Sequence, residues 1–266
     1  MRNTTMLISS PTSVAEAPEW GILVQARLGS TRLPNKMLRE ILPGTTLLEW
    51  VLRRLLAVFP AGKILLATTT ASVDDALVEV ARKFGVGVFQ GNEQDVLLRF
   101  REAARSAGWD HIIRVCADNP LLQVDLLPGL VSAATAARAD YASWGFRDGL
   151  PAIRSHCGLF AEWASLAALD RAAEATDDPL YHEHVTNYLY SHPDEYRTIM
   201  MPVPHEDKVR QWRLTVDTED DLALCTRVIN GIGHERPLGV GELLGYLDMH
   251  PDLITEMRTN MSAHVK

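Results

Sequence analysis

The chain has 266 residues, 47% of them hydrophobic, and a formal net charge of −8 at pH 7. This acidic balance argues against broad nucleic-acid binding, which depends on Lys and Arg neutralising phosphates, and no run approaches the roughly 18 apolar residues of a membrane span. The three cysteines lie far apart without CxxC spacing, which excludes a disulfide framework and indicates a cytoplasmic location.

The N-terminal 19 residues are mostly polar, and Met6-Leu7-Ile8 is their apolar patch. That patch is too short for the core of a signal peptide. We therefore expect residues 1–19 to form a disordered extension that takes no part in the fold.

The next hundred residues alternate short β-rich runs with helical patterns, which is typical of a parallel sheet covered by helices. Strands are predicted at residues 21–26, 63–68, 86–89 and 111–116, and helices at residues 46–59, 72–84 and 95–107. Thr46 and Glu49 have the spacing of a capping box, which marks the start of the first helix.

The pattern is less regular after Pro120. Strands are predicted at residues 141–144, 199–203 and 212–216, and helices at residues 125–137, 163–175 and 218–232. Residues 145–207 hold no clear βαβ repeat, so an inserted lobe is expected there. A helical tail is expected at residues 236–266.

The strongest candidate site is the loop at residues 25–36, directly after the first strand. In open α/β folds, ligands bind at this carboxyl edge of the sheet. Arg27, Arg32 and Lys36 surround Gly29, and Ser30 adds a hydroxyl. Glycine lets the backbone approach a phosphate, and the cations can donate charge-assisted hydrogen bonds to it. A solvated basic loop is the alternative, because this is neither a Walker A sequence nor a GxGxxG fingerprint.

Two carboxylates are candidates for a cation site. Asp118 follows the fourth predicted strand, and Asp217 ends the predicted strand at residues 212–216. Carboxylates at the ends of strands can converge above the sheet, and Mg²⁺ prefers one or two carboxylates together with phosphates and water. The alternative makes Asp118 a turn former and Asp217 a helix N-cap.

The loop at residues 25–36 resembles the signature of the cytidylyltransferases that make CMP-activated sugars. It is most similar to the spore-coat polysaccharide group, which is related to the CMP-Kdo and CMP-sialate synthetases. Further similar blocks follow in the order of the family at residues 67–70 with 74–75, 91–100, 114–121, 182–186 and 213–222.

This resemblance implies an α/β, Rossmann-like fold of the nucleotide-diphospho-sugar transferase (GT-A) type, with a mixed sheet and helices on both faces. It places the cytidylyltransferase domain at residues 20–235, with the lobe at about 145–207 used for acceptor recognition or dimerisation. It also implies CTP and a sugar or sugar-acid acceptor as substrates, Mg²⁺ as cofactor, and a homodimer.

The resemblance also assigns roles to individual residues. The implied catalytic residues are Arg27, Lys36, Asp118 and Asp217, and the last two would hold the metal. The implied nucleotide-binding residues are Gln25, Ala26, Arg27, Gly29, Ser30, Arg32, Lys36, Thr68, Gly91, Asp95 and Arg99. The resemblance places His184 near the acceptor, and Arg154 is a second acceptor-side candidate because it lies where the chain departs from its relatives. For Asp95 an ordinary helix start is the alternative, and a zinc site at His182 and His184 lacks a third ligand with convincing spacing.

The chain departs from its relatives at residues 149–154. Where relatives show an acidic Asp-x-Glu pattern after Gly-Leu, this chain has Pro151-Ala152-Ile153-Arg154, which suggests a different or more anionic acceptor. Asn35 replaces a glycine common before the loop lysine, and asparagine can still adopt the left-handed conformation.

Two other functions compete with this interpretation. A nucleotide-sugar-dependent glycosyltransferase would share the fold, but such enzymes commonly hold their metal through an Asp-x-Asp motif that Asp118-Asn119-Pro120 lacks. A regulatory protein that binds nucleotide without turnover is the second alternative, favoured by the altered residues 149–154.

Overall fold

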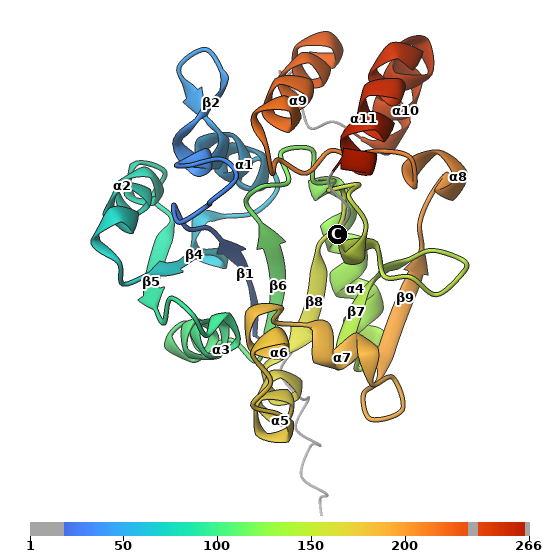
Figure 1. Cartoon of the computed structure of the whole chain (residues 1–266). Helices are drawn as coiled ribbons and strands as arrows, with labels where there is room; N and C mark the ends of the chain where they lie inside the picture. The colour runs from blue at the N-terminus through green and yellow to red at the C-terminus, as the bar shows by residue number, and fades with distance from the viewer. Residues whose placement is uncertain (1–18, 234–238, 264–266) are drawn as a thin grey trace, which may run out of the picture.

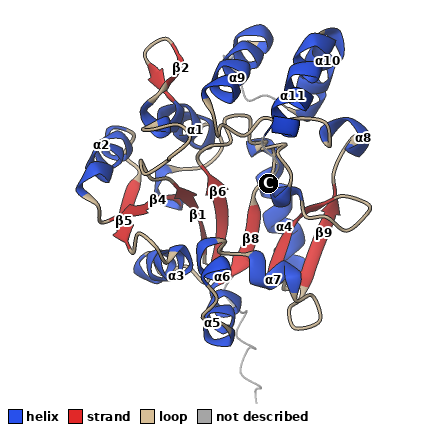
Figure 2. Cartoon of the chain, in the orientation of Figure 1, coloured by secondary structure: helices blue, strands red, loops and turns tan. Residues whose placement is uncertain are grey.

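The computed structural model describes residues 19–233 and 239–263. The predicted extension at residues 1–19 therefore lies almost wholly outside the described part of the chain. A seven-stranded sheet in the order β5-β4-β1-β6-β8-β7-β9 forms the centre, with helices on both sides (Figures 1 and 2). Its strands are β1 (Trp20–Gln25), β4 (Ile64–Thr69), β5 (Gly87–Gly91), β6 (His111–Cys116), β7 (Tyr141–Gly145), β8 (Glu162–Ser165) and β9 (Thr198–Pro202).

The sheet is mostly parallel. β5, β4, β1 and β6 run parallel to one another, β8 is antiparallel to both β6 and β7, and β9 is parallel to β7. A two-stranded sheet of β2 (Glu40–Leu42) and β3 (Thr45–Thr46) precedes the first helix. The mixed α/β fold expected from the resemblance is confirmed.

Helices cover both faces of the sheet because successive strand residues point in opposite directions. In β1, Ile22 and Val24 face a larger core, and Leu23 faces a smaller one. The larger core includes buried residues of α1 (Leu47–Leu56), α2 (Asp75–Lys83), α4 (Leu127–Ala137), α9 (Glu219–Ile232), α10 (Val240–Met249) and α11 (Pro251–Ala263). The smaller core includes those of α3 (Val96–Ser106), α5 (Leu166–Ala175) and α7 (Asn187–Ser191). Two further short helices are α6 (Pro179–Glu183) and α8 (Glu206–Val209).

Several local expectations are confirmed. β6 has the predicted bounds, and the capping box at Thr46 and Glu49 starts α1. Asn35 adopts the left-handed conformation, with φ 56°. None of the helices in the described ranges has the length and hydropathy needed to cross a bilayer.

The prediction of one helix over residues 163–175 is wrong at its start. Glu162–Ser165 forms β8, which is buried between β6 and β7, and the helix begins only at Leu166 with Ser165 as its N-cap. Tertiary pairing overrides the local helical pattern here. β8 and β9, both within the predicted lobe at residues 145–207, belong to the same sheet as β1.

The predicted strand at residues 212–216 is also wrong. This segment forms no ladder in the structure, and single backbone hydrogen bonds hold it: Leu214 N–H donates to the His156 carbonyl at 2.9 Å, and Val216 N–H donates to the Asp118 carbonyl at 2.8 Å. The apolar residues that suggested a strand are buried as irregular backbone. Asp217 therefore does not end a strand, although it does lie just before α9.

Gly158 sets how closely this segment can approach the start of β8. It has φ +61°, and a Cβ atom there would lie 2.8 Å from the Leu214 backbone. Both the conformation and the contact exclude a side chain.

We expect Gly158→Ala to lower the free energy of unfolding by about 2 kcal/mol or more. Gly129→Ala is the matched control, because Gly129 lies in α4 with open space around its Cα, and there alanine should add about 0.5–1 kcal/mol. Urea unfolding measures both, and equal effects at the two glycines would contradict this assignment.

Asp74, just before α2, anchors the loop that follows β1. It is 1% exposed. Its Oδ1 accepts from Leu28 N–H at 2.8 Å, and its Oδ2 accepts from the hydroxyls of Thr68 and Thr69 at 3.1 and 2.5 Å. One buried carboxylate thus ties the base of the loop to the end of β4.

Asp74→Ala should reduce stability by about 2–4 kcal/mol, because it leaves buried donors without acceptors. The exposed neighbour Asp75 provides the control, since Asp75→Ala should change stability by no more than about 0.5 kcal/mol. Thermal unfolding of the two variants would compare them directly, and a stable Asp74→Ala protein would refute the anchoring role.

Candidate active site

Lys36 brings together three segments that are far apart in the sequence. Its Nζ donates to Asp118 Oδ2 at 2.9 Å and to the Val216 carbonyl at 2.9 Å, and lies 3.7 Å from Asp217 Oδ1. Asp118 lies in the turn after β6, and Asp217 precedes α9. The two carboxylates predicted to converge therefore do so, with the predicted loop lysine between them. We call these three side chains the Lys36 junction.

The junction is partly buried, with 12% of the Lys36 side chain and 11% of the Asp217 side chain exposed. Burial by itself lowers the pKa of Lys36, but Asp118 and then Asp217 more than offset it, so that this pKa lies above its ordinary value. Lys36 therefore remains a cation at neutral pH and neutralises part of the charge of the two carboxylates.

Asp217 is held by cations on two sides. Arg32 Nη2 lies 3.2 Å from Oδ1, and Arg213 Nη2 lies 3.6 Å from Oδ2. Asp217 Oδ2 is buried and has no hydrogen-bond partner among the described residues. An anionic oxygen in this condition is suited to accept a cation as ligand.

Asp221 and Arg213 form a buried pair beneath Asp217 that the sequence analysis did not single out. Arg213 Nε and Nη2 donate to the two Asp221 oxygens at 2.6 and 2.8 Å. Asp221 Oδ2 also accepts from the backbone N–H groups of Asp217 and Thr218 at 3.1 and 3.0 Å. Burial raises the pKa of Asp221, but the bonds from Arg213 outweigh it and the pKa is lowered. The signal in the sequence was the spacing of Thr218 and Asp221, which form a capping box.

The turn that carries Asp118 rests on α1. Trp50 Nε1 donates to the Pro120 carbonyl at 2.8 Å, and Arg54 Nη2 donates to the Leu122 carbonyl at 2.7 Å. Both side chains are buried. No motif pointed to them, because they act on backbone carbonyls that any sequence supplies.

The loop itself presents a mixture of free and engaged groups. Arg27, Gly29 and Arg32 are exposed, Ser30 is half-buried and Ala26 is buried. The exposed cations stand at the carboxyl edge of β1, as the sequence predicts. A ligand could reach them there.

Gln25 is engaged within the protein. Its Oε1 accepts from Arg114 Nε and Nη2 at 3.2 and 3.0 Å, and Arg114 Nη1 donates to Glu162 Oε2 at 2.6 Å. Glu162 Oε1 in turn accepts from the hydroxyls of Tyr141 and Thr186 at 2.6 and 2.7 Å. This buried network, missed from the sequence, joins the base of the loop to the start of α7.

Thr68 and Arg99 are buried more deeply than the sequence suggested. Thr68 is 0% exposed, and its hydroxyl donates to Asp74. Arg99, also 0% exposed, packs against Gly91 and donates from Nη1 to the Asn92 carbonyl at 2.5 Å. Its Nε and Nη2 find no partner in the described part of the chain. Burial, then the charge of nearby Arg27, lowers the pKa of Arg99 to about 10.

Asp95 stands at an ordinary helix start, which is the alternative to its predicted contact with the nucleotide. Its Oδ1 accepts from Leu98 N–H at 2.7 Å and caps α3, and its Oδ2 lies 2.8 Å from His182 Nδ1. Both oxygens are engaged, so that contact between this carboxylate and a nucleotide stays a prediction.

Both predicted acceptor residues are exposed. Arg154 ends a single 3₁₀ turn, and His184 follows α6. The charge of Arg154 acts on Tyr190 of α7, whose pKa is raised to about 12, by burial first and then by Glu162. Arg154 and the buried Glu162 therefore both lie close enough to Tyr190 for their charges to act on it.

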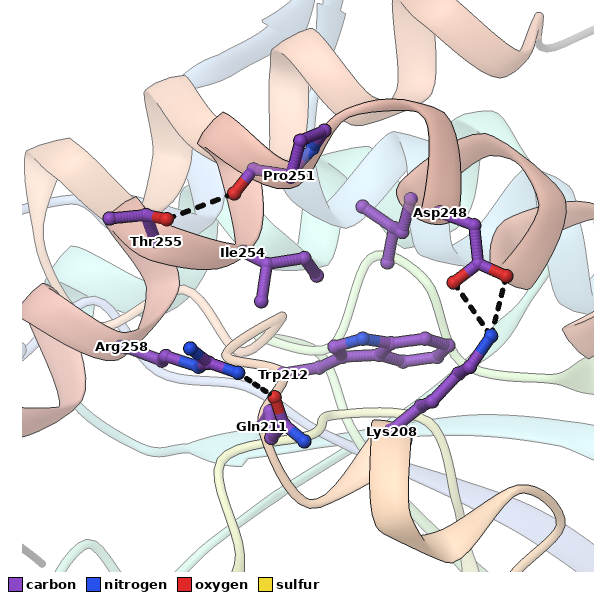
Figure 3. Close-up of a pocket in the computed structure, with 9 residues that line it drawn as sticks. Lys208, Gln211, Trp212, Asp248, Pro251, Ile254, Thr255 and Arg258 are labelled. Carbon is purple, nitrogen blue, oxygen red and sulfur yellow. Dashed lines mark hydrogen bonds and ion pairs between the residues drawn. The ribbon is translucent and has the colours of Figure 1, made fainter.

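A separate pocket of about 320 Å³ lies between α8 and the C-terminal helices (Figure 3). Trp212 lines it, and Lys208 and Arg258 are bonded within it to Asp248 and Gln211. None of the predicted site residues lines this pocket.

The chain is similar to known proteins over most of its length. The sequence profile described as "Cytidylyltransferase" matches residues 21–228. The chain is 32% identical to the spore coat polysaccharide biosynthesis protein SpsF of Bacillus subtilis, over 88% of this chain and 96% of that protein. It is 25% identical to the 3-deoxy-manno-octulosonate cytidylyltransferase of Elusimicrobium minutum, over 80% of this chain and 90% of that one.

A solved cytidylyltransferase from Leptospira borgpetersenii superposes with a TM-score of 0.80 at 27% identity, covering 89% of this chain and 97% of that chain. The matched profile spans the Lys36 junction and its supports, from β1 to α9. The chain therefore belongs to the cytidylyltransferase family and is a nucleotidyltransferase.

Proposed function

We propose that the protein transfers CMP from CTP to a sugar or sugar-acid acceptor and releases pyrophosphate. The observation that carries the proposal is the Lys36 junction, where a cationic loop and two converging carboxylates meet at the carboxyl edge of the sheet. Such an edge is the usual ligand site of open α/β folds. The names of the relatives support CTP as donor.

The roles of the residues follow from their charge and exposure. Arg27 and Arg32 are exposed cations that would bind phosphate oxygens, and Gly29 leaves room for the backbone to approach them. Lys36 would bind the outer phosphates. Binding and orientation by these groups bring the acceptor oxygen in line with the α-phosphorus, which is the main contribution expected of the protein in such a transfer.

Asp118 and Asp217 fit a divalent cation, Mg²⁺ in our proposal. Mg²⁺ binds through one or two carboxylates while keeping waters and substrate phosphates, and Asp217 Oδ2 is a buried oxygen that lacks a hydrogen-bond partner within the described residues. When bound, the cation would neutralise charge on the triphosphate.

Arg154 and His184 are proposed on the acceptor side. Arg154 is an exposed cation in the stretch where relatives carry acids, and it would attract a carboxylate or phosphate on the acceptor. Two relatives are named for spore-coat polysaccharide and for 3-deoxy-manno-octulosonate. We propose an anionic sugar of this general class, used by a homodimeric protein in the cytoplasm.

Free pyrophosphate distinguishes this function from its rivals. The protein is incubated with each of the four NTPs, Mg²⁺ and a panel of sugar acids, and pyrophosphate is measured. Pyrophosphate with CTP supports the proposal. Transfer of sugar from a nucleotide sugar without pyrophosphate would favour a glycosyltransferase, and CTP binding without turnover would favour a regulator.

Asp217→Asn tests the metal role. It should lower turnover by about a hundredfold or more, because asparagine lacks the negative charge that would hold the divalent cation. That cation would neutralise charge on the phosphates. Asp220→Asn, at an exposed position in the first turn of α9, is the control and should retain normal turnover. Near-normal activity of Asp217→Asn with a normal circular dichroism spectrum would exclude the role.

Lys36→Ala tests the contact to the outer phosphates. It should weaken CTP binding by about tenfold or more and affect CMP much less, since CMP lacks those phosphates. Calorimetry with both nucleotides measures the difference. Arg39→Ala removes a nearby exposed cation that pairs with Glu219 at 2.6 Å and should change neither affinity, whereas equal weakening of CTP and CMP by Lys36→Ala would disprove the placement.

A further inference from the structure

His182, in α6, lies between two hydrogen-bond acceptors, and we call this pair of contacts the clasp. Its Nδ1 lies 2.8 Å from Asp95 Oδ2, and its Nε2 lies 3.0 Å from the Thr176 carbonyl. A carboxylate and a carbonyl only accept hydrogen bonds, and a neutral imidazole has a single N–H. Both bonds can therefore form together only when His182 is the imidazolium cation.

The two acceptors lie at helix ends of opposite polarity: the end of α5 favours a cation, whereas at the positive start of α3 the cation is attracted by the carboxylate of Asp95 and not by the helix. Thr176 is the C-cap of α5, at the negative end of that helix, and Asp95 is the N-cap of α3. Asp177 adds further negative charge near the ring, and Arg99, one turn along α3, interacts with the same Asp95 carboxylate. The bond to the Thr176 carbonyl, opposed by burial and aided by Asp95 and Asp177, raises the pKa of His182 above its ordinary value.

The clasp connects two sides of the candidate site. α3 follows the segment that carries Gly91, and α6 leads through His184 to α7 (Figure 1). At the far end of this stretch, Thr186 donates to the buried Glu162. The segment at residues 179–191 is thus attached to α3 at His182 and to the sheet at Thr186, just before α7.

We propose that His182 is a positioning residue: as a cation it fastens residues 179–191 to α3, and its deprotonation loosens them. The positioning role of His182 rests on the proposed function, in which His184 lies on the acceptor side. The loosening itself does not depend on that function.

The direction of the pH effect follows from the raised pKa of His182. Its contribution is fully present below the unfolded value of about 6.5 and is lost as the pH rises through the folded value. The backbone amide hydrogens of residues 179–191 are therefore expected to exchange fast with solvent at about pH 9 and slowly at about pH 6.

Hydrogen exchange tests the proposal without any substrate. After correction for intrinsic rates, exchange of residues 179–191 should be about tenfold faster at pH 9 than at pH 6, the loss expected for a charge-assisted bond. His182→Gln should exchange fast at both pH values. His182→Arg, which keeps its charge, should stay protected at both.

A second measurement reads the clasp itself. In protein labelled at histidine, the NMR pH titration of His182 should fall to lower pH in Asp95→Asn, because asparagine keeps the N-cap of α3 but removes the charge. His250→Gln is the control: His250 also bonds to a carbonyl, that of Tyr246 at 2.8 Å, but in α10. It should leave both the exchange and the titration of His182 unchanged.

The proposal is overturned if exchange of residues 179–191 is independent of pH in the unsubstituted protein, or if His182 titrates at or below its ordinary value. It is also overturned if His182→Gln exchanges like His182→Arg. A protein that releases no pyrophosphate but shows the pH-dependent exchange would refute the proposed function and leave the clasp intact.

Discussion

The ammonium of Lys36 is the group on which the candidate site depends. Two carboxylates as close as Asp118 and Asp217 repel each other, and a cation between them offsets that repulsion. The three groups come from a loop after β1, a turn after β6 and the segment before α9. The fold must bring all three to one point, and each has its own support.

The supports share one physical form. Asp74 holds the loop, Trp50 and Arg54 hold the turn, and Arg213 with Asp221 holds the segment before α9. In each case a buried polar side chain bonds to backbone or to a buried partner, where a lost bond costs most. In the proposed reaction Lys36 would bind phosphates, and a divalent cation would take over its part in neutralising the two carboxylates.

The sequence predicted which charged groups gather at the candidate site better than it predicted which residues hold them in place. The loop cations follow from their place after β1, and Asp118 from its place after β6, whose apolar run predicts its bounds. Asp217 was singled out through a strand that does not form, yet it lies 3.7 Å from Lys36 Nζ. Asp74 was noted only within a block similar to the family, and Arg114 and Glu162 were missed as a pair, because their partners are distant in the sequence. β8 and residues 212–216 failed for the same reason: pairing with β6 and β7, and single bonds to His156 and Asp118, decide their conformation.

Residues 149–154, where the chain departs from its relatives, lie beside the end of β7. Pro151 forms a β-bridge with Gly145 and is buried, as is Ala152, whereas Arg154 is exposed. The stretch is therefore attached to the end of β7 through its backbone and buried side chains. Because the Lys36 junction and its supports use none of these residues, the proposed acceptor side could carry acidic or basic groups without altering the frame proposed to bind the donor. A family built in this way can keep one nucleotide site and vary its acceptor by exposed substitutions beside it.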